Sequence, residues 1–255
     1  LVGSEMCIRD RPFFARYCRT LGKELLGMTA RFHKSWADFG SLKNRAALEY
    51  ECFSMLANGA KCSIGDQMHP RGKLNKAAYK RIGEIYKSVA EKEPWCVEAK
   101  PVVQIGIVSV ASQEDVSGSS IHASDEGAMR MLLETHHQFD VLDLEADFSR
   151  YKLLILPDSV LVSPAIQKKL DSFLEEKGSI ILSYESGLNQ KKESFVLPQI
   201  GIKYIGKDEY SPNYFQVTEK IAHRIPQMPH IMYEGSIKVC LLYTSDAADE
   251  GLGVD

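Results

Sequence analysis

Apolar runs and helical patterns alternate along residues 101–185. The run PVVQIGIVSV (101–110) is rich in β-branched residues and predicts a buried strand, and FDVLDL, YKLLILPD and SIILSYES predict three more. After the first of these runs, EGAMRMLLETHHQF carries Met129, Leu132, Leu133 and His136 at helical spacing. Strands that alternate with helices are typical of βαβ units, in which helices cover both faces of a parallel sheet.

The segment SPAIQKKLDSFLEEKG predicts a further helix with well-marked ends. Ser163 stands at the N-cap position, Pro164 in the first turn and Gly178 after the last turn. The apolar positions of its inner face are Ile166, Leu170, Phe173 and Leu174. This helix therefore separates the third and fourth predicted strands.

Residues 12–100 follow a different pattern, because polar and aromatic segments come after each predicted strand. Leu25 to Met28 predict one short strand, and AKCSIGDQ (60–67) predicts another. Helices are expected from about Asn44 to Asn58 and across LNKAAYKRIGEIYKSVAEKE (74–93), and KEPWCVEAKP (92–101) is expected to be a linker. The order is βαβα, and in a (β/α)8 barrel the segments after the strands bind substrate.

Both ends of the chain are expected to be foreign to the protein. Met6–Asp10 can be encoded by ATG TGT ATA AGA GAC A, and the reverse complement of that DNA encodes Cys240–Tyr243. Such an inverted repeat resembles the translated adaptor ends of a sequencing library. Residues 1–11 and 240–255 are therefore interpreted as adaptor-derived and excluded from fold reasoning.

Charge and cysteine content exclude several classes of protein. The formal net charge of -3 moves close to zero without the two ends, so the chain has no electrostatic footprint for nucleic acid or an anionic membrane. No apolar run is long enough to span a bilayer. Outside the ends, four cysteines are scattered without metal-binding spacing, which favours reduced thiols and a cytoplasmic protein. Since the true N-terminus is expected to be missing, export of the parent protein stays open.

Familiar catalytic and cofactor motifs do not occur. The sequence has no glycine-rich phosphate loop of the dinucleotide or Walker type, so no cofactor is expected. His136 and His137 fall in a predicted helix, which favours one packed and one exposed ring over a metal site. No metal site is predicted.

Two polar segments after the strands of 12–100 carry the candidate chemistry. The first, ARFHKSWADFG, offers Arg31, His33, Trp36 and Asp38, and the second offers Asp66, Gln67, His69 and Arg71. Sugars need this mixture, because their hydroxyls bind charged hydrogen-bond partners and their C–H faces stack on aromatic rings. An alternative is that Trp36 and Phe39 simply close the end of a barrel. The residues predicted to bind a sugar are Arg31, His33, Trp36, Asp66, Gln67 and His69.

The stretch from Gly27 to Leu74, with EPWC behind it, resembles the end of the catalytic barrel in glycoside hydrolases related to family 42 β-galactosidases and bacterial α-L-fucosidases. The chain from Pro101 onward resembles the β-galactosidase trimerisation domain. The resemblance implies an α/β protein with the C-terminal part of a (β/α)8 barrel at 12–97 and a flavodoxin-like doubly wound parallel-sheet domain, incomplete at its C-terminus, at 98–239. It also implies a carbohydrate substrate and a homotrimer.

One position departs from the family 42 pattern. The resemblance places Thr29 where those enzymes have their catalytic glutamate at the end of the seventh barrel strand. Retaining glycosidases generally use two carboxyls, and threonine cannot replace one of them. The fucosidase-like alternative, in which the nucleophile comes from an earlier strand, is therefore favoured over the family 42 mechanism. Asp66 is the one candidate catalytic carboxylate in the chain, and the role of a sugar ligand fits it better.

Two functions compete for the parent protein. The first is an exo-acting glycoside hydrolase of which this chain is an inactive fragment, and the second is a non-catalytic sugar-binding or assembly protein on a degenerate barrel. A third interpretation, a flavin or nucleotide site in the second domain, is disfavoured. The long stretch ASQEDVSGSSIHASDEG stands where a flavodoxin has a short phosphate loop.

Overall fold

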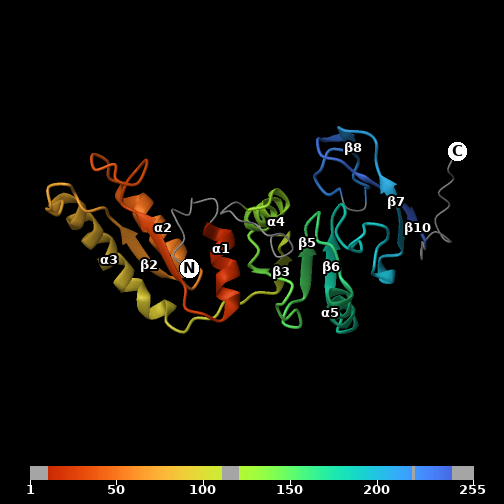
Figure 1. The fold of residues 1–255 in the computed structure, drawn as a ribbon, viewed down its shortest axis with the longest axis horizontal. Helices are drawn as coiled ribbons and strands as arrows, with labels where there is room; N and C mark the ends of the chain where they lie inside the picture. Colours follow the sequence, from red (N-terminus) through yellow and green to blue (C-terminus); the bar gives the residue numbers. More distant parts are fainter. Residues whose placement is uncertain (1–10, 111–120, 220–221, 243–255) are drawn as a thin grey trace. The chain divides into compact units, whose positions relative to one another are not determined.

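This computed structural model describes residues 11–110, 121–219 and 222–242 (Figure 1). The chain divides into two compact units, Leu1–Leu154 and Ile155–Asp255, with the division inside β5 (Leu153–Leu156). Parallel strand pairs and helices make up the first unit, so the α/β class predicted from the sequence is confirmed.

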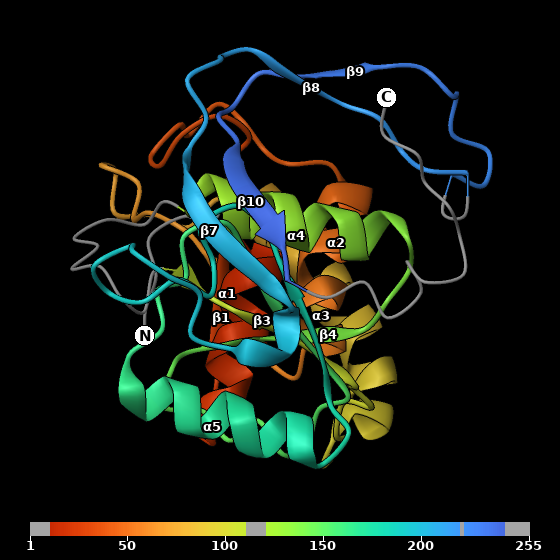
Figure 2. The same cartoon turned by 90° about the vertical axis from the view of Figure 1, so that its right-hand side faces the viewer.

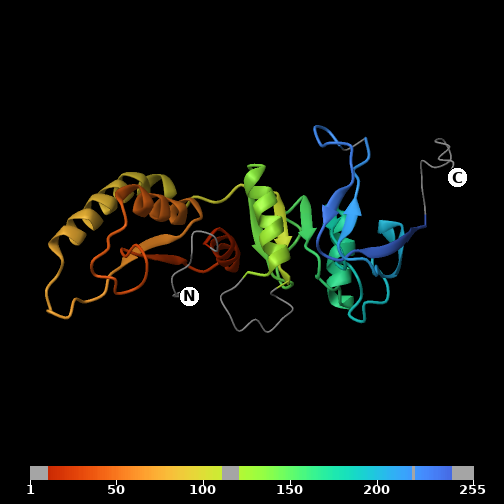
Figure 3. The same cartoon turned by 90° about the horizontal axis from the view of Figure 1, so that it is seen from above.

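The first strands of the first unit belong to a βαβα segment. It consists of β1 (Leu26–Ala30), α2 (Arg45–Ala57), β2 (Lys61–Gly65) and α3 (Lys76–Cys96). β1 and β2 pair in parallel, with Leu26 opposite Lys61 and Ala30 opposite Gly65. Figures 1 and 3 show α2 and α3 beside this pair. The core between them contains Leu48, Cys52, Ile85 and Val89, with Cys62 and Ile64 packed against it.

Helix α2 starts and stops where its sequence dictates. The Asn44 side chain accepts a hydrogen bond of 2.8 Å from Ala47 N, which satisfies one of the free amides of the first turn. Leu48, Cys52 and Met55 form its buried face at helical spacing. The chain leaves the helix through Gly59, whose φ of 78° is a conformation that glycine adopts without strain.

Helix α3 is longer than the sequence predicts. Asn75 caps it, but it continues through Pro94 to Cys96, so the prediction of a linker from 92 onward is wrong for its first half. Proline removes one main-chain donor, and near the last turn this costs a single intrahelical hydrogen bond. The helix ends at Cys96, and the amide of the next residue, Val97, still donates to Glu93 O at 3.1 Å.

The outer edge of β2 is occupied by a side chain of α3. The backbone groups of Cys62 and Ile64 alternate along β2 with those that face β1. The Tyr86 hydroxyl accepts from Ile64 N at 3.2 Å and donates to Cys62 O at 3.3 Å. Tyr86 thus satisfies main-chain groups that would otherwise stand open at a sheet edge.

A second parallel pair follows in the first unit. β3 (Ile105–Val108) pairs with β4 (Phe139–Leu142), and α4 (Ala123–Glu134) connects them. Met129 and Leu132 are buried, as the helical spacing predicts. The helix ends before His136, which has a φ of 59°, and both histidines are exposed. The prediction that they lie on a helix is therefore wrong.

Helix α1 (Arg11–Cys18) and the 3₁₀ turn Arg19–Leu21 have no counterpart in the sequence predictions. The guanidinium of Arg16 lies 4.5 Å from the ring centroid of Phe139. Arg19 Nε lies 2.7 Å from Oδ1 of Asp140, a buried carboxylate of β4 that also accepts from Tyr151. α1 is thus held by tertiary contacts rather than by its own short pattern.

Strand order in the larger sheet is β4-β3-β5-β6, where β6 is Ser179–Leu182. Helix α5 (Pro164–Glu175) precedes β6 in the chain, and the Ser163 side chain accepts from Ile166 N at its start, as predicted. All four strands and this helix were expected from the sequence, although each strand is shorter than the run that predicts it.

The rest of the second unit is built from two antiparallel pairs (Figure 2). β7 (Ile202–Lys207) pairs with β10 (Ile237–Leu241), and β8 (Asn213–Phe215) pairs with β9 (His230–Met232). The ends interpreted as adaptor lie mostly outside the described residues. Of those described, Arg11 begins α1, Cys240 and Leu241 end β10, and Leu242 follows it.

Candidate functional site

Arg31 and Asp66 meet at the ends of β1 and β2. Each directly follows its strand, and the parallel register brings both to the same edge of the sheet. Arg31 Nε lies 2.7 Å from Asp66 Oδ1, and the Arg31 side chain is 2% exposed. Its Nη1 donates to Ser41 O at 2.8 Å, and its guanidinium lies 4.2 Å from the ring centroid of Phe32. The guanidinium is thereby held in one orientation.

The two carboxylate oxygens of Asp66 differ in their contacts. Its Oδ1 accepts both from Arg31 Nε and from Gln67 N, the latter at 2.8 Å. Within the described part of the chain, Oδ2 receives no hydrogen bond. A carboxylate oxygen that is charged, held in place and uncommitted is a strong acceptor for a hydroxyl group.

A cavity of about 420 Å³ opens beside this pair. The strand ends supply a cation and an anion, and the loop and first turn of α3 supply amide, imidazole, ammonium and phenol groups. Asp66 is the one carboxylate among the described residues that line it. The full lining is Arg31, Asp66, Gln67, Met68, His69, Gly72, Lys73, Leu74, Asn75 and Tyr79.

Trp36 joins the two polar segments. Its Nε1 donates to Gln67 Oε1, and its ring lies edge-on to Phe32 with centroids 5.5 Å apart. The ring also lies over Gly65, where a Cβ atom would come within 2.7 Å of it. Phe39 meets His69 in the same way at 4.9 Å. Trp36 is 40% exposed, so it combines packing with a free ring surface.

Of the six residues predicted to bind a sugar, four line the cavity and one contacts its lining. Arg31, Asp66, Gln67 and His69 line it, and Trp36 hydrogen-bonds to Gln67. His33 is exposed and does not line it, and its backbone amide donates to Ser41 Oγ at 3.0 Å. The sequence predictions did not include Lys73, Asn75 and Tyr79, which reach the cavity because α3 starts there.

Thr29 belongs to a buried polar network on the helix side of β1. Its hydroxyl donates to Glu51 Oε2 of α2, and Lys43 Nζ lies 2.9 Å from Glu51 Oε1 and 3.1 Å from the Thr29 hydroxyl. Thr29 is 3% and Glu51 4% exposed. The network was not predicted, although Glu51 stands between Leu48 and Met55 on the apolar face of α2, which is a visible signal.

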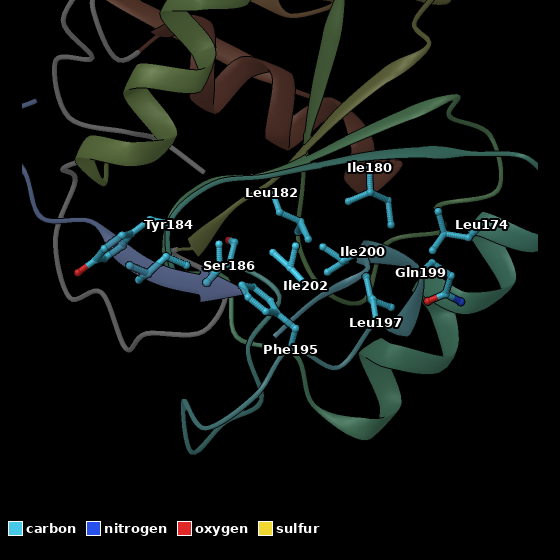
Figure 4. A pocket seen from close by; sticks show the side chains of 12 residues that line it. Leu174, Ile180, Leu182, Tyr184, Ser186, Phe195, Leu197, Gln199, Ile200 and Ile202 are labelled. Atoms are coloured by element: carbon cyan, nitrogen blue, oxygen red, sulfur yellow. The ribbon is translucent and has the colours of Figure 1, made fainter. Parts of the chain in front are cut away.

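The second unit contains a further cavity of about 440 Å³ (Figure 4). Its lining comes from α5, β6, β7 and β10 and the segment between β6 and β7, and it is mainly aliphatic, with Leu182, Ile200 and Ile202 among the side chains shown. Sugar hydroxyls need hydrogen-bond partners, which this lining offers mainly through Tyr184, Ser186 and Gln199. The cavity between Arg31 and Tyr79 is therefore the better candidate for a sugar site.

Two other features, a metal site and a membrane-spanning helix, are not found within residues 11–110, 121–219 and 222–242. No group of three or more histidine, cysteine, aspartate or glutamate side chains there could hold a metal ion. None of the helices in that part of the chain has the length and apolar character to cross a membrane.

Part of the chain is similar to a known domain family. Residues 128–201 match the β-galactosidase trimerisation domain family. This match covers β4, β5, α5 and β6 together with most of α4. The resemblance to this group of glycoside hydrolases, stated from the sequence, is confirmed.

Individual relatives extend the similarity over nearly the whole chain. The structure of α-L-fucosidase isoenzyme 2 from Paenibacillus thiaminolyticus is 39% identical with a TM-score of 0.82, covering 89% of this chain and 35% of that one. A β-galactosidase from Rahnella sp. R3 superposes with a TM-score of 0.71 at 16% identity, covering 91% of this chain and 40% of that one. β-Galactosidase LacZ of Lactobacillus acidophilus is 22% identical over 189 residues, 64% of this chain and 28% of that protein. The chain thus spans about a third of the relatives that it matches.

Proposed function

We propose that this chain is part of an exo-acting glycoside hydrolase and that the cavity beside Arg31 and Asp66 holds the sugar. The observation that carries this proposal is the buried ion pair at the ends of two parallel strands, with one free carboxylate oxygen beside a cavity. Similarity to a fucosidase structure at 39% identity supports the same class of enzyme. Neutral sugars are bound by this combination of charged hydrogen-bond partners and exposed aromatic surface.

The finer fold belongs to this proposal. The segment β1-α2-β2-α3 has the form of the last two βα units of a (β/α)8 barrel, within the predicted domain 12–97. The order β4-β3-β5-β6 reproduces the first four positions of the flavodoxin-like order 2-1-3-4-5, which supports a flavodoxin-like domain at 98–239. The trimerisation domain match supports a homo-oligomer, with a trimer as the assembly.

The role of Asp66 is to bind the sugar. Retaining hydrolysis needs two carboxyls about 5 to 5.5 Å apart. Among the described residues, the cavity offers one carboxylate, and that one is paired with Arg31. We therefore expect this chain by itself to bind without turnover, with the reacting carboxyls supplied by other parts of the parent enzyme.

An α-L-fucoside is the favoured substrate over a β-galactoside. The fucosidase structure is 39% identical, whereas the β-galactosidase from Rahnella is 16% identical. Thr29, aligned with the family 42 nucleophile, is engaged with Glu51 on the helix side of the strand. Both observations fit an enzyme whose nucleophile stands on another strand.

The single carboxylate also fits the competing function, a non-catalytic sugar-binding protein on a degenerate barrel. The adjoining parts of the gene distinguish the two. Carboxylates at the ends of the preceding barrel strands support the enzyme, and their loss supports the binding protein.

Titration with monosaccharides tests the proposed site. L-Fucose, D-galactose and D-glucose are added in turn to the ¹⁵N-labelled chain, and amide shifts are followed by NMR. We expect L-fucose to move the amides of Gln67 and His69, and Asp66→Asn to abolish this response, while in the absence of sugar its spectrum differs only around Arg31 and Gln67. An identical response in Asp66→Asn would refute the site, and release of nitrophenol from an aryl fucoside by the chain alone would refute the division of labour.

A further inference from the structure

Several side chains that line the proposed sugar cavity have their acceptor atoms engaged within the protein. Gln67 Oε1 accepts a hydrogen bond from the Trp36 indole. His69 Nδ1 accepts from a main-chain amide of its own loop at 3.1 Å. Asn75 Oδ1 accepts from two amides at the start of α3, at 3.1 and 3.2 Å. Gln67, His69 and Asn75 could each donate or accept, and each uses its acceptor on the protein.

The hydrogen-bonding atoms that remain on this lining are mostly donors. Gln67 and Asn75 keep their NH2 groups, and neutral His69 carries its proton on Nε2 because Nδ1 is the acceptor. The Arg31 guanidinium is bound through Nε and Nη1, which leaves Nη2. Within the described part of the chain, none of these atoms donates to the protein. Asp66 Oδ2 is the one uncommitted side-chain oxygen of the lining that can only accept.

Lys73 adds a positive charge to this donor-rich lining. Arg31 and Asp66 form an ion pair at 2.7 Å, so their charges compensate each other. Lys73 is exposed in the loop before α3 and forms no salt bridge with any of the residues that the structure describes. The lining therefore has two permanent cations and one carboxylate, and its excess of positive charge favours a ligand of negative charge.

We propose that the sugar held in this cavity carries an anionic substituent, a sulfate ester or a carboxylate, and that Lys73 makes the site selective for it. Such a group presents only acceptor oxygens, which match the donors of the lining. A neutral hydroxyl also brings a proton that needs an acceptor, and Asp66 Oδ2 can serve one such hydroxyl. The inference rests on the proposed function, because it concerns the substrate of the same site. For an α-L-fucoside, it specifies a sulfated one.

The expected preference for the anionic sugar is moderate and depends on salt. A hydrogen bond to a charged group is stronger than a neutral one by enough to change the affinity about tenfold. Because Lys73 is exposed, added salt screens its charge. The preference should therefore decrease as the ionic strength rises, whereas binding of a neutral sugar should depend little on salt.

Titration with matched neutral and anionic sugars tests the proposal. Methyl α-L-fucoside is compared with its sulfate monoesters, and D-galactose with D-galacturonate, by following the amide shifts of Gln67 and His69 in the ¹⁵N-labelled chain. We expect the anionic member of at least one pair to bind about tenfold more tightly at low ionic strength. The pair that shows this difference tells a sulfate ester from a carboxylate.

Two lysine variants locate the preference. In Lys73→Gln, we expect the ratio of the anionic to the neutral affinity to fall toward one. Lys80→Gln is the matched control, because Lys80 is exposed on α3 and does not line the cavity, and it should keep the full ratio. An unchanged ratio in Lys73→Gln would refute the role of Lys73.

The results that contradict the inference differ from those that contradict the proposed function. Equal affinities for the neutral and anionic sugars of both pairs would overturn the inference and leave the sugar site standing. If no sugar moves the amides of Gln67 and His69, both are wrong. Inorganic sulfate is added alone at equal ionic strength, and the same shifts with the same affinity as a sulfated fucoside would mean a site for simple anions, which also overturns the inference.

Discussion

Arg31 Nε and Asp66 Oδ1 lie 2.7 Å apart and join the ends of β1 and β2. Since the guanidinium also donates to Ser41 O, the same cation fixes both strand ends and the loop that carries Trp36. The two strand ends and the Trp36 loop of the proposed sugar site are therefore held together through contacts of Arg31. Changes to its centre and to its supports should have distinct effects.

Replacing Arg31 should affect binding and stability together. In Arg31→Gln, the buried cation is lost and Asp66 remains as an unpaired, mostly buried charge. We expect the free energy of unfolding to fall by about 3 kcal/mol, in line with a broken buried pair. Urea unfolding followed by circular dichroism measures the loss. Arg71→Gln is the control, because Arg71 is exposed and does not line the cavity.

Gly65 is expected to be required for the position of Trp36. In Gly65→Ala, the new methyl group would lie 2.7 Å from the indole ring, so the ring must move. We expect a changed fluorescence maximum of Trp36, weaker binding of L-fucose and a loss of roughly 1–3 kcal/mol in stability from overpacking. An unchanged emission spectrum would contradict the contact.

A matched glycine in α3 provides the control for that substitution. Gly83 has open space around the position of a Cβ atom. Gly83→Ala should stabilise the chain by roughly 0.5–1 kcal/mol, because alanine favours the helix. It should leave the emission of Trp36 unchanged.

Glu51 is expected to stabilise the site from the helix side of β1. In Glu51→Gln, the charge that holds Lys43 Nζ and the Thr29 hydroxyl is removed from a buried position. We expect unfolding to become easier by roughly 2 kcal/mol, since hydrogen bonds to buried charges are strong. Because Lys43 N donates to Arg31 O at 2.9 Å, the amide signal of Arg31 should also shift. Glu91→Gln at an exposed position of α3 should leave stability and that signal unchanged.

Alkylation of Cys62 should follow its pKa. A hydrogen bond with the Cys52 thiol lowers the pKa of Cys62 to about 7. The thiolate fraction of Cys62 and the rate at which iodoacetamide alkylates it should therefore rise with pH, and both should reach half of their limiting values near pH 7. Cys18, whose pKa burial raises, should react only at higher pH. Peptide mass spectrometry at each pH measures both rates. A Cys62 midpoint near that of Cys18 would contradict the coupling to Cys52.

Local sequence signals predicted most of the helices and parallel strands. The start of α2 at Asn44 and the cap of α5 at Ser163 were expected, because a helix start depends on a few adjacent residues. The end of α3 was misplaced because proline usually stops a helix, whereas here Pro94 falls so near the end that little is lost. Helix α1 was missed because its stability comes from Phe139 and Asp140, which are distant in sequence.

Local signals also allowed part of the candidate site's geometry to be expected from the sequence. The polar segments that contain Arg31 and Asp66 could be brought together from the sequence, since each follows a predicted strand, whereas their ion pair is seen only in the structure. His33 belongs to the same polar segment but turns outward, and only the path of the loop decides that. Glu51 was missed because a charged residue on an apolar helix face finds its partners, Thr29 and Lys43, only after the chain has folded.

The Tyr86 hydroxyl occupies the hydrogen-bonding groups Ile64 N and Cys62 O at the edge of β2. Any strand that adds to this side, from the same chain or another, must first displace that hydroxyl and replace both of its hydrogen bonds. The addition of an unwanted strand is therefore less favourable. A neighbouring strand that forms a full row of main-chain hydrogen bonds with β2 still has a net favourable free energy of pairing. A single phenol can in this way oppose aggregation at the edge of β2.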